Sequence, residues 1–88
     1  SMLVITYDEH GGFYDSVAPG GTVEPDTQDS PGDNGFVFNQ LGVRVPAVIV
    51  SPMVKFGVDP TPYDHSSVLA TLERLLGFGA LTARDAAA

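Results

Sequence analysis

The fold class is decided by the stretch LVITYDEHGG (residues 3–12), where an apolar run gives way to two acids, a histidine and a pair of glycines. The run from Leu3 to Tyr7 is rich in β-branched residues and shows no alternation of polar and apolar side chains. This pattern is typical of a strand that is covered on both faces, as in a parallel sheet. Gly11 and Gly12 then end the run. The stretch predicts an interior strand over residues 3–7 that stops at a group of ionisable side chains.

A second interior strand is predicted over residues 45–50 (VPAVIV), which end at Ser51-Pro52. Pro46 is tolerated near the start of a strand, because the backbone N–H that proline lacks is not needed there for a hydrogen bond between strands. Two strands covered on both faces need neighbouring strands, and helices above and below them, yet the 88 residues supply one clear helix. A chain of this size also buries only about 60 to 65% of its unfolded surface. We therefore expect an α/β fragment, a single partial domain spanning residues 1–88.

That one clear helix is predicted to begin within Asp64-His65-Ser66-Ser67, because apolar residues then recur at spacings of three and four. Its apolar face comprises Val68, Leu69, Leu72, Leu75 and Leu76. Asp64 or Ser66 is the expected N-cap, and Gly77 is the expected C-cap. Residues 80–88 are expected to add a partial turn, capped by Thr82 or Asp85.

The charge of the chain excludes some classes of partner. Eleven acids and four bases give a net charge of −7, which argues against a surface for nucleic acid or for anionic membranes. The chain has no cysteine, so disulfides and thiolate metal sites are excluded. No apolar run approaches the ~18 residues that span a membrane, and the first residues lack the basic lead segment of a signal peptide.

The acidic residues Asp8 and Glu9 lie where a ligand is expected. In open parallel sheets, ligands bind beyond the carboxyl ends of the strands. Neighbouring residues on an extended strand point to opposite sides, so both carboxylates can hold one cation only if the backbone bends after Asp8. Gly11 and Gly12 supply the freedom for such a bend. The alternative interpretation is a solvated acidic turn.

His65 is the second candidate, because it lies beside Asp64 at the expected start of the helix. A histidine whose ring contacts a carboxylate is a common arrangement near metal and phosphate sites. The alternative is a helix cap with an incidental histidine. Ser66 and Ser67 are interpreted as capping residues, since neither lies in the Gly-x-Ser-x-Gly setting of a nucleophile elbow.

Other charged residues are given structural interpretations. Asp15 is expected to cap a turn, and Arg44 and Lys55 are interpreted as surface charges near the second strand. The stretch EPDTQDSPGDNG (residues 24–35) does not match the calcium loop of an EF-hand and is interpreted as a solvated acidic loop.

Four motifs together resemble the C-terminal end of the bacterial phosphoesterase family, which includes phospholipases C and an acid phosphatase of the alkaline-phosphatase-like superfamily. They are YDEHGGFYD (7–15), LGVRVPAVIVSP (41–52), YDHSSVLATLERLLG (63–77) and LTARD (81–85). The resemblance covers most of the chain except a variable acidic loop over residues 18–34. It implies that this piece comes from a parallel-sheet sandwich, with two main strands and one clear helix.

The resemblance also implies roles for individual residues. Asp8 and Glu9 match the pair that ligates the catalytic metal, a divalent ion such as Ca²⁺, Mg²⁺, Mn²⁺ or Zn²⁺. His65 matches a histidine near the metal or the transferred phosphoryl group and is the expected catalytic residue. His10 and Asp64 are expected to contact and orient the residues that bind the metal or the phosphoryl group, without binding either themselves.

The family's N-terminal Glu-Asn metal motif and its nucleophile segment are absent from these 88 residues. The resemblance therefore implies hydrolysis of a phosphate ester or phospholipid by a larger parent, with this chain inactive alone. Members of the family are often exported. The alternative hypothesis is a non-catalytic interaction module that keeps a remnant of the fold and associates with itself through uncovered sheet surface.

Overall fold

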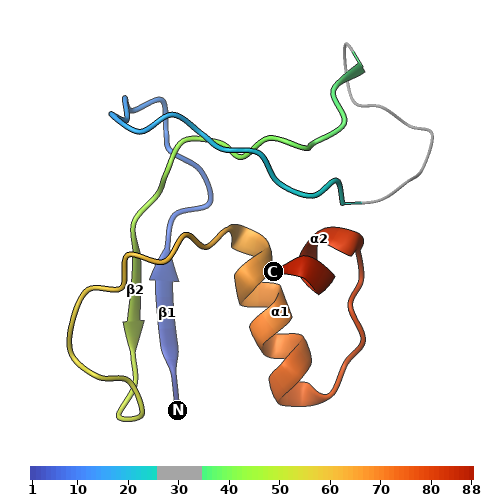
Figure 1. Ribbon diagram of the computed structural model, residues 1–88. Helices are drawn as coiled ribbons and strands as arrows, with labels where there is room; N and C mark the ends of the chain where they lie inside the picture. The colour runs from blue at the N-terminus through green and yellow to red at the C-terminus, as the bar shows by residue number, and fades with distance from the viewer. Residues whose placement is uncertain (26–34) are drawn as a thin grey trace. The chain divides into compact units, whose positions relative to one another are not determined.

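The computed structural model describes residues 1–25 and 35–88 (Figure 1). Its elements, in chain order, are β1 (Leu3–Thr6), β2 (Ala47–Val50), α1 (His65–Leu76) and α2 (Ala83–Ala87). The chain divides into two compact units. The strand unit is Ser1–Pro19 with Gly42–Thr61, and the helix unit is Gly20–Leu41 with Pro62–Ala88. The predicted α/β class, its two main strands and its clear helix are confirmed.

The two strands form one antiparallel pair, in which Leu3 lies opposite Val50 and Thr6 lies opposite Ala47 (Figure 1). The hydroxyl of Thr6 extends the pairing by donating a hydrogen bond to the carbonyl oxygen of Pro46, at 2.9 Å. The parallel arrangement expected from the sequence is wrong for this pair. An unbroken apolar run indicates burial on both faces, but it carries no information about the direction of the neighbouring strand.

The side chains of this sheet are about half exposed within the described residues. Ile5 is 52% exposed and its cross-strand partner Val48 is 53% exposed, while Ile49, on the opposite face from Val48, is 52% exposed. Apolar side chains on both faces of a soluble sheet are usually covered. The apolar surface of the pair is therefore available to further chain or to a partner on each face.

In the helix unit, α1 begins and ends where the sequence predicts. Asp64 is the N-cap, and its Oδ1 accepts from the backbone N–H of Ser67 at 3.2 Å. The hydroxyl of Ser67 accepts from the backbone N–H of Asp64 at 3.2 Å, which completes a capping box. Gly77 ends the helix with a φ of 74°, in the left-handed region that favours glycine. Of the two expected N-caps, Asp64 is the one that forms.

The predicted C-terminal turn is also confirmed, as the short helix α2, which has Thr82 as its N-cap. Its Asp85 is 2% exposed and accepts backbone hydrogen bonds from Leu81 and Thr82, both at 2.7 Å, as well as the hydroxyl of Thr82. Glu73 of α1 is 6% exposed and forms a side-chain hydrogen bond with Asp85. A buried pair of carboxyl groups therefore lies where α2 meets α1.

The rest of the helix unit is joined by backbone hydrogen bonds. The N–H of Thr22 donates to the carbonyl of Asn39, and that of Leu41 donates to the carbonyl of Gly20, both at 2.9 Å. Residues 26–34, which make up much of the predicted acidic loop (18–34), lie outside the described residues. That the whole chain forms one partial domain stays a prediction. Across residues 1–25 and 35–88, no helix combines the length and the hydrophobicity needed to cross a bilayer.

Candidate functional site

The carboxylate loop, residues 7–15, leaves the end of β1 and bends at its glycine pair. Gly11 has a φ of 66° and Gly12 a φ of 87°, both in the left-handed region that L side chains disfavour. The N–H of Gly12 donates to Nδ1 of His10 at 3.0 Å, and the N–H of Phe13 donates to the carbonyl of His10 at 3.2 Å. The loop therefore has the glycine-dependent bend that the sequence predicts after the strand.

The donor groups of this loop suit a hard cation. Asp8 and Glu9 are exposed, and Oδ1 of Asp8 accepts the backbone N–H of Glu9 at 3.0 Å, which orients the carboxylate. Carboxylate oxygens are the ligands that Ca²⁺, Mg²⁺ and Mn²⁺ prefer. Among the described residues, no group of three or more acidic or histidine side chains is placed to hold a metal. Asp8 and Glu9 therefore supply hard oxygen donors, but the described residues complete no coordination shell around them.

The half-buried His10 is arranged as a hydrogen-bond donor. Its Nδ1 accepts the N–H of Gly12, so in the neutral imidazole the proton lies on Nε2. A protonated Nε2 cannot coordinate a metal, but it can donate to an oxygen bound nearby. This geometry suits the supporting role expected from the sequence better than it suits direct coordination.

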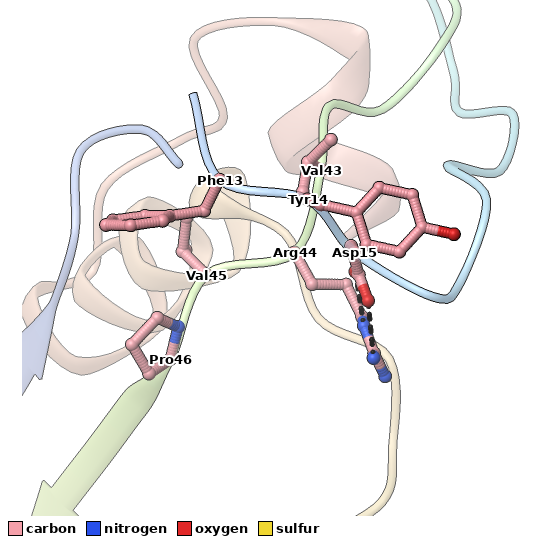
Figure 2. Close-up of a pocket in the computed structure, with 7 residues that line it drawn as sticks. All are labelled: Phe13, Tyr14, Asp15, Val43, Arg44, Val45 and Pro46. Carbon is pink, nitrogen blue, oxygen red and sulfur yellow. Dashed lines mark hydrogen bonds and ion pairs between the residues drawn. The ribbon is translucent and has the colours of Figure 1, made fainter. Parts of the chain in front are cut away.

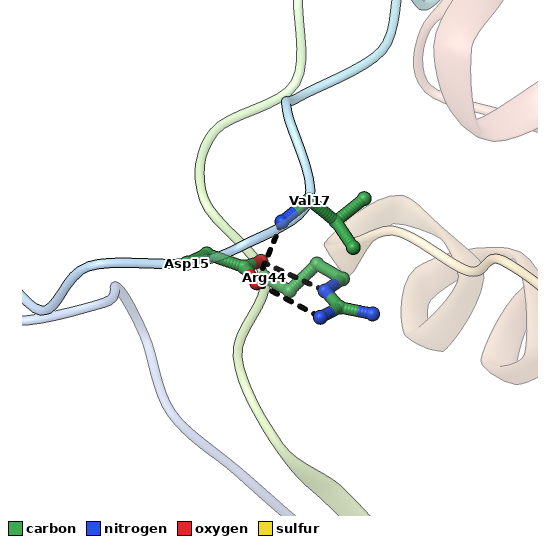
Figure 3. A network of polar contacts seen from close by, with 3 residues as sticks. All are labelled: Asp15, Val17 and Arg44. Carbon is green, nitrogen blue, oxygen red and sulfur yellow. Dashed lines mark hydrogen bonds and ion pairs between the residues drawn. The ribbon is translucent and has the colours of Figure 1, made fainter.

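Asp15 closes the loop through an ion pair that the sequence did not predict (Figure 3). Its two oxygens accept from Nε and Nη2 of Arg44, at 2.7 and 2.8 Å, and Oδ1 also accepts the N–H of Val17 at 3.1 Å. The bond to Arg44, and then that to Val17, hold the pKa of the Asp15 carboxyl well below its usual range. The expected turn cap at Asp15 is confirmed by its bond to Val17. Arg44 is exposed, as a surface charge would be, but it also forms an ion pair with Asp15. The sequence held one sign of this ion pair: Arg44 is the single charged residue in the otherwise apolar stretch 41–50.

The same pair forms part of the wall of an open cavity of about 350 Å³ in the strand unit (Figure 2). The cavity is lined by residues 13–15 and 43–46, which bring aromatic, apolar and charged side chains together. Asp8, Glu9 and His10 do not line it. It lies at the far end of the carboxylate loop from β1.

Asp64 and His65 lie together at the start of α1, as expected. Oδ1 of Asp64 accepts from the hydroxyl of Ser66 at 2.7 Å as well as from the N–H of Ser67. Its capping role is therefore shown by geometry, and His65 is the exposed first residue of the helix. Convergence of His65 with Asp8 and Glu9 stays a prediction, because the carboxylates belong to the strand unit and the imidazole belongs to the helix unit.

Substitution can separate the capping role of Asp64 from the effect of its negative charge. We expect Asp64→Ala to destabilise α1 by about 1 kcal/mol, because the first-turn donors lose their acceptor. Asp64→Asn retains a capping oxygen and should cost far less, since asparagine and aspartate cap about equally well. Urea unfolding followed by far-ultraviolet circular dichroism measures both. Equal losses in the two variants would show that the charge, and not the cap, stabilises the helix start.

Comparison with known proteins places these features in a family. A family model described as the phosphoesterase family matches residues 1–79. Non-specific phospholipase C6 of Arabidopsis thaliana is 43% identical, over 98% of this chain and 19% of its own length. Non-hemolytic phospholipase C of Burkholderia pseudomallei is 38% identical over 83% of the chain, and phospholipase C B of Mycobacterium tuberculosis is 36% identical over 88%.

These relatives come from a plant as well as from bacteria, so the likeness is wider than the bacterial proteins that the motifs suggested. The chain spans about a fifth or less of the length of each of these relatives. The match to the family model includes the carboxylate loop, both strands and α1. This chain belongs to the phosphoesterase family.

Proposed function

We propose that a longer protein containing this chain hydrolyses phosphate esters with the help of a divalent metal ion, and that Asp8 and Glu9 supply part of its coordination shell. The observation that carries the proposal is the position of two exposed carboxylates on a glycine bend directly after β1, in a chain of this family. The names of the relatives, all phospholipases C, support a phospholipid or a related phosphate ester as the substrate.

Each residue has a chemical task in this proposal. A bound divalent ion would polarise the phosphoryl group and offset its negative charge. Asp8 and Glu9 would hold that ion with hard oxygen ligands. The Nε2–H of His10 would donate to a metal-bound or phosphoryl oxygen, and His65 would hold or move a proton near the phosphoryl group. Asp64, which is occupied in capping α1, would fix the position of His65.

We expect the 88-residue chain to be inactive alone. Two carboxylates without their remaining ligands form an incomplete shell, which should bind metal only at about millimolar concentration or above. Calorimetric titrations with Ca²⁺, Mg²⁺, Mn²⁺ and Zn²⁺ measure this affinity. Hydrolysis of p-nitrophenyl phosphate and of phosphatidylcholine vesicles should be found only in the longer protein. Substantial turnover by the 88-residue chain, or micromolar metal affinity, would contradict the incomplete-site proposal.

A second candidate function is a self-associating interaction module, and the half-exposed apolar side chains of β1 and β2 favour it. It predicts concentration-dependent oligomers of this chain in light scattering. Ile5→Lys, which puts a charge on the sheet, should dissociate them. Val58→Lys is the matched control, because Val58 is 95% exposed and lies outside the strands. A monomer at all concentrations would exclude this function.

A further inference from the structure

We propose that the Asp15–Arg44 ion pair is a positioning clamp for the carboxylate loop: it holds the bend that presents Asp8 and Glu9, and thereby sets the affinity of these residues for a divalent cation. The inference rests on the proposed function, because it concerns the same metal ligands. It adds two residues that lie outside the expected ligand set, from two segments that are 29 positions apart.

Both ends of the carboxylate loop are tied to one short stretch of chain. At its start, Thr6 pairs with Ala47 in the sheet, and its hydroxyl donates to the carbonyl of Pro46. At its end, Asp15 binds Arg44, three residues before Ala47. The chain thus leaves β1 at Thr6 and returns at Asp15 to Arg44, just before β2 begins. The eight residues between these anchors form a closed loop.

The bonds inside the loop are local. The N–H groups of Glu9, Gly12 and Phe13 each donate to a group no more than three residues away. Gly11 and Gly12 can adopt many other backbone conformations, because glycine lacks a Cβ. Local bonds and two glycines favour the observed bend weakly. A long-range anchor at the far end, between Asp15 and Arg44, limits the other conformations that the loop can adopt.

The ion pair has the geometry of a strong anchor. Its two hydrogen bonds are parallel and charge-assisted, an arrangement that fixes direction as well as distance. The Asp15 side chain is 11% exposed, so water competes little for its oxygens, although the Arg44 side chain is 65% exposed. Both Asp15 oxygens are occupied by the guanidinium (Figure 2), which argues against Asp15 as a metal ligand in its own right.

The clamp is tested in the full-length protein that contains this chain, with metal affinity as the main measurement. Groups that orient metal ligands typically change metal affinity 10- to 100-fold when they are removed. We expect Asp15→Asn and Arg44→Lys each to weaken Mn²⁺ binding to the metal-free protein by about 10-fold or more in calorimetry. The kcat at saturating Mn²⁺ should remain within about 2-fold of the parent value, because saturating metal restores the occupied site.

Three further measurements separate positioning from general stability. The double variant Asp15→Arg with Arg44→Asp restores a pair of opposite charges and should recover most of the lost affinity. Amide exchange at Gly11 and Gly12 should accelerate in Asp15→Asn without metal, and slow again in the double variant. Asp59→Asn is the matched control, since Asp59 accepts the N–H of Thr61 in another turn of the same unit and should leave Mn²⁺ affinity unchanged.

Unchanged Mn²⁺ affinity in Asp15→Asn and Arg44→Lys would overturn the clamp, as would a lowered melting temperature with no change in metal dependence. A loss of kcat that saturating Mn²⁺ does not restore would also overturn it. Failure of the underlying function gives a different result, because Asp8→Asn would then leave Mn²⁺ affinity and activity unchanged. If Asp8→Asn abolishes metal binding while Asp15→Asn does not affect it, only the clamp is wrong.

Discussion

If the proposed function is right, replacing Asp8 or Glu9 by alanine will lower phosphate-ester hydrolysis by more than about 100-fold in a longer protein that contains this chain. Groups that only orient metal ligands are worth 10- to 100-fold, so a lost ligand should cost more than that. In the proposed site, each substitution would remove one negative charge and one carboxylate ligand from the shell of the metal ion. The initial rate of p-nitrophenyl phosphate hydrolysis, measured across a range of Mn²⁺ concentrations, gives the size of the effect.

Conservative variants separate this loss of a ligand from damage to the loop. Asp8→Asn keeps an oxygen that can accept the N–H of Glu9, so the turn should survive while the charge is lost. Glu24→Gln is the matched control, because Glu24 is exposed and belongs to the helix unit. Activity that falls equally in Glu24→Gln and Asp8→Asn would point to the overall charge of the protein, and the assignment of Asp8 as a ligand would then be wrong.

The features that the sequence predicted well are those with local causes. The caps of α1, at Asp64 and Gly77, depend on residues within a few positions, and so does the Thr82 cap of α2. The bend after β1 depends on two adjacent glycines whose φ values are positive. Such features follow from hydrogen bonding and steric limits of one short segment. Local sequence is therefore sufficient to place them.

Features that join distant segments were not predictable in the same way. An apolar run does not encode whether its neighbour is parallel, so the antiparallel pairing of β1 with β2 needed the structure. The Asp15–Arg44 bond joins two loops, and each residue alone resembles an ordinary surface charge. Glu73 occupies a helix position without any local sign of burial, and it becomes buried where Asp85 of α2 meets it.

The contact between α1 and α2 is expected to be most stable near pH 4 and to weaken on both sides of it. Burial, and then the hydrogen bond to Asp85, raise the pKa of Glu73 above its ordinary value of 4.5. The hydroxyl of Thr82 and the N–H of Leu81 lower the pKa of Asp85 below its ordinary value of 3.8. Near pH 4 these two directions favour a protonated Glu73 that donates to an ionised Asp85.

The two pKa shifts decide how stability changes on each side of pH 4: the alkaline arm of the profile is the loss above it, and the acid arm is the loss below it. In the unfolded chain Glu73 loses its proton near pH 4.5, while the folded pair retains it, so the stability contributed by Glu73 falls as pH rises above that value. The stability contributed by Asp85 is complete above pH 3.8 and is lost as pH falls below it.

Glu73→Gln is expected to remove the alkaline arm and leave the acid arm, since the glutamine amide can still donate to Asp85 but does not titrate. Asp85→Asn should instead expose the amides of Leu81 and Thr82, with exchange faster by about 10-fold or more, because their acceptor loses its charge. Amide exchange between about pH 3 and pH 8, corrected for the intrinsic rate, measures both effects. Asp59→Asn is the control for a general change in charge, because Asp59 belongs to the strand unit. An alkaline arm that persists in Glu73→Gln would show that another group controls the docking of α2, and a flat profile in the unmodified chain would exclude the shared proton.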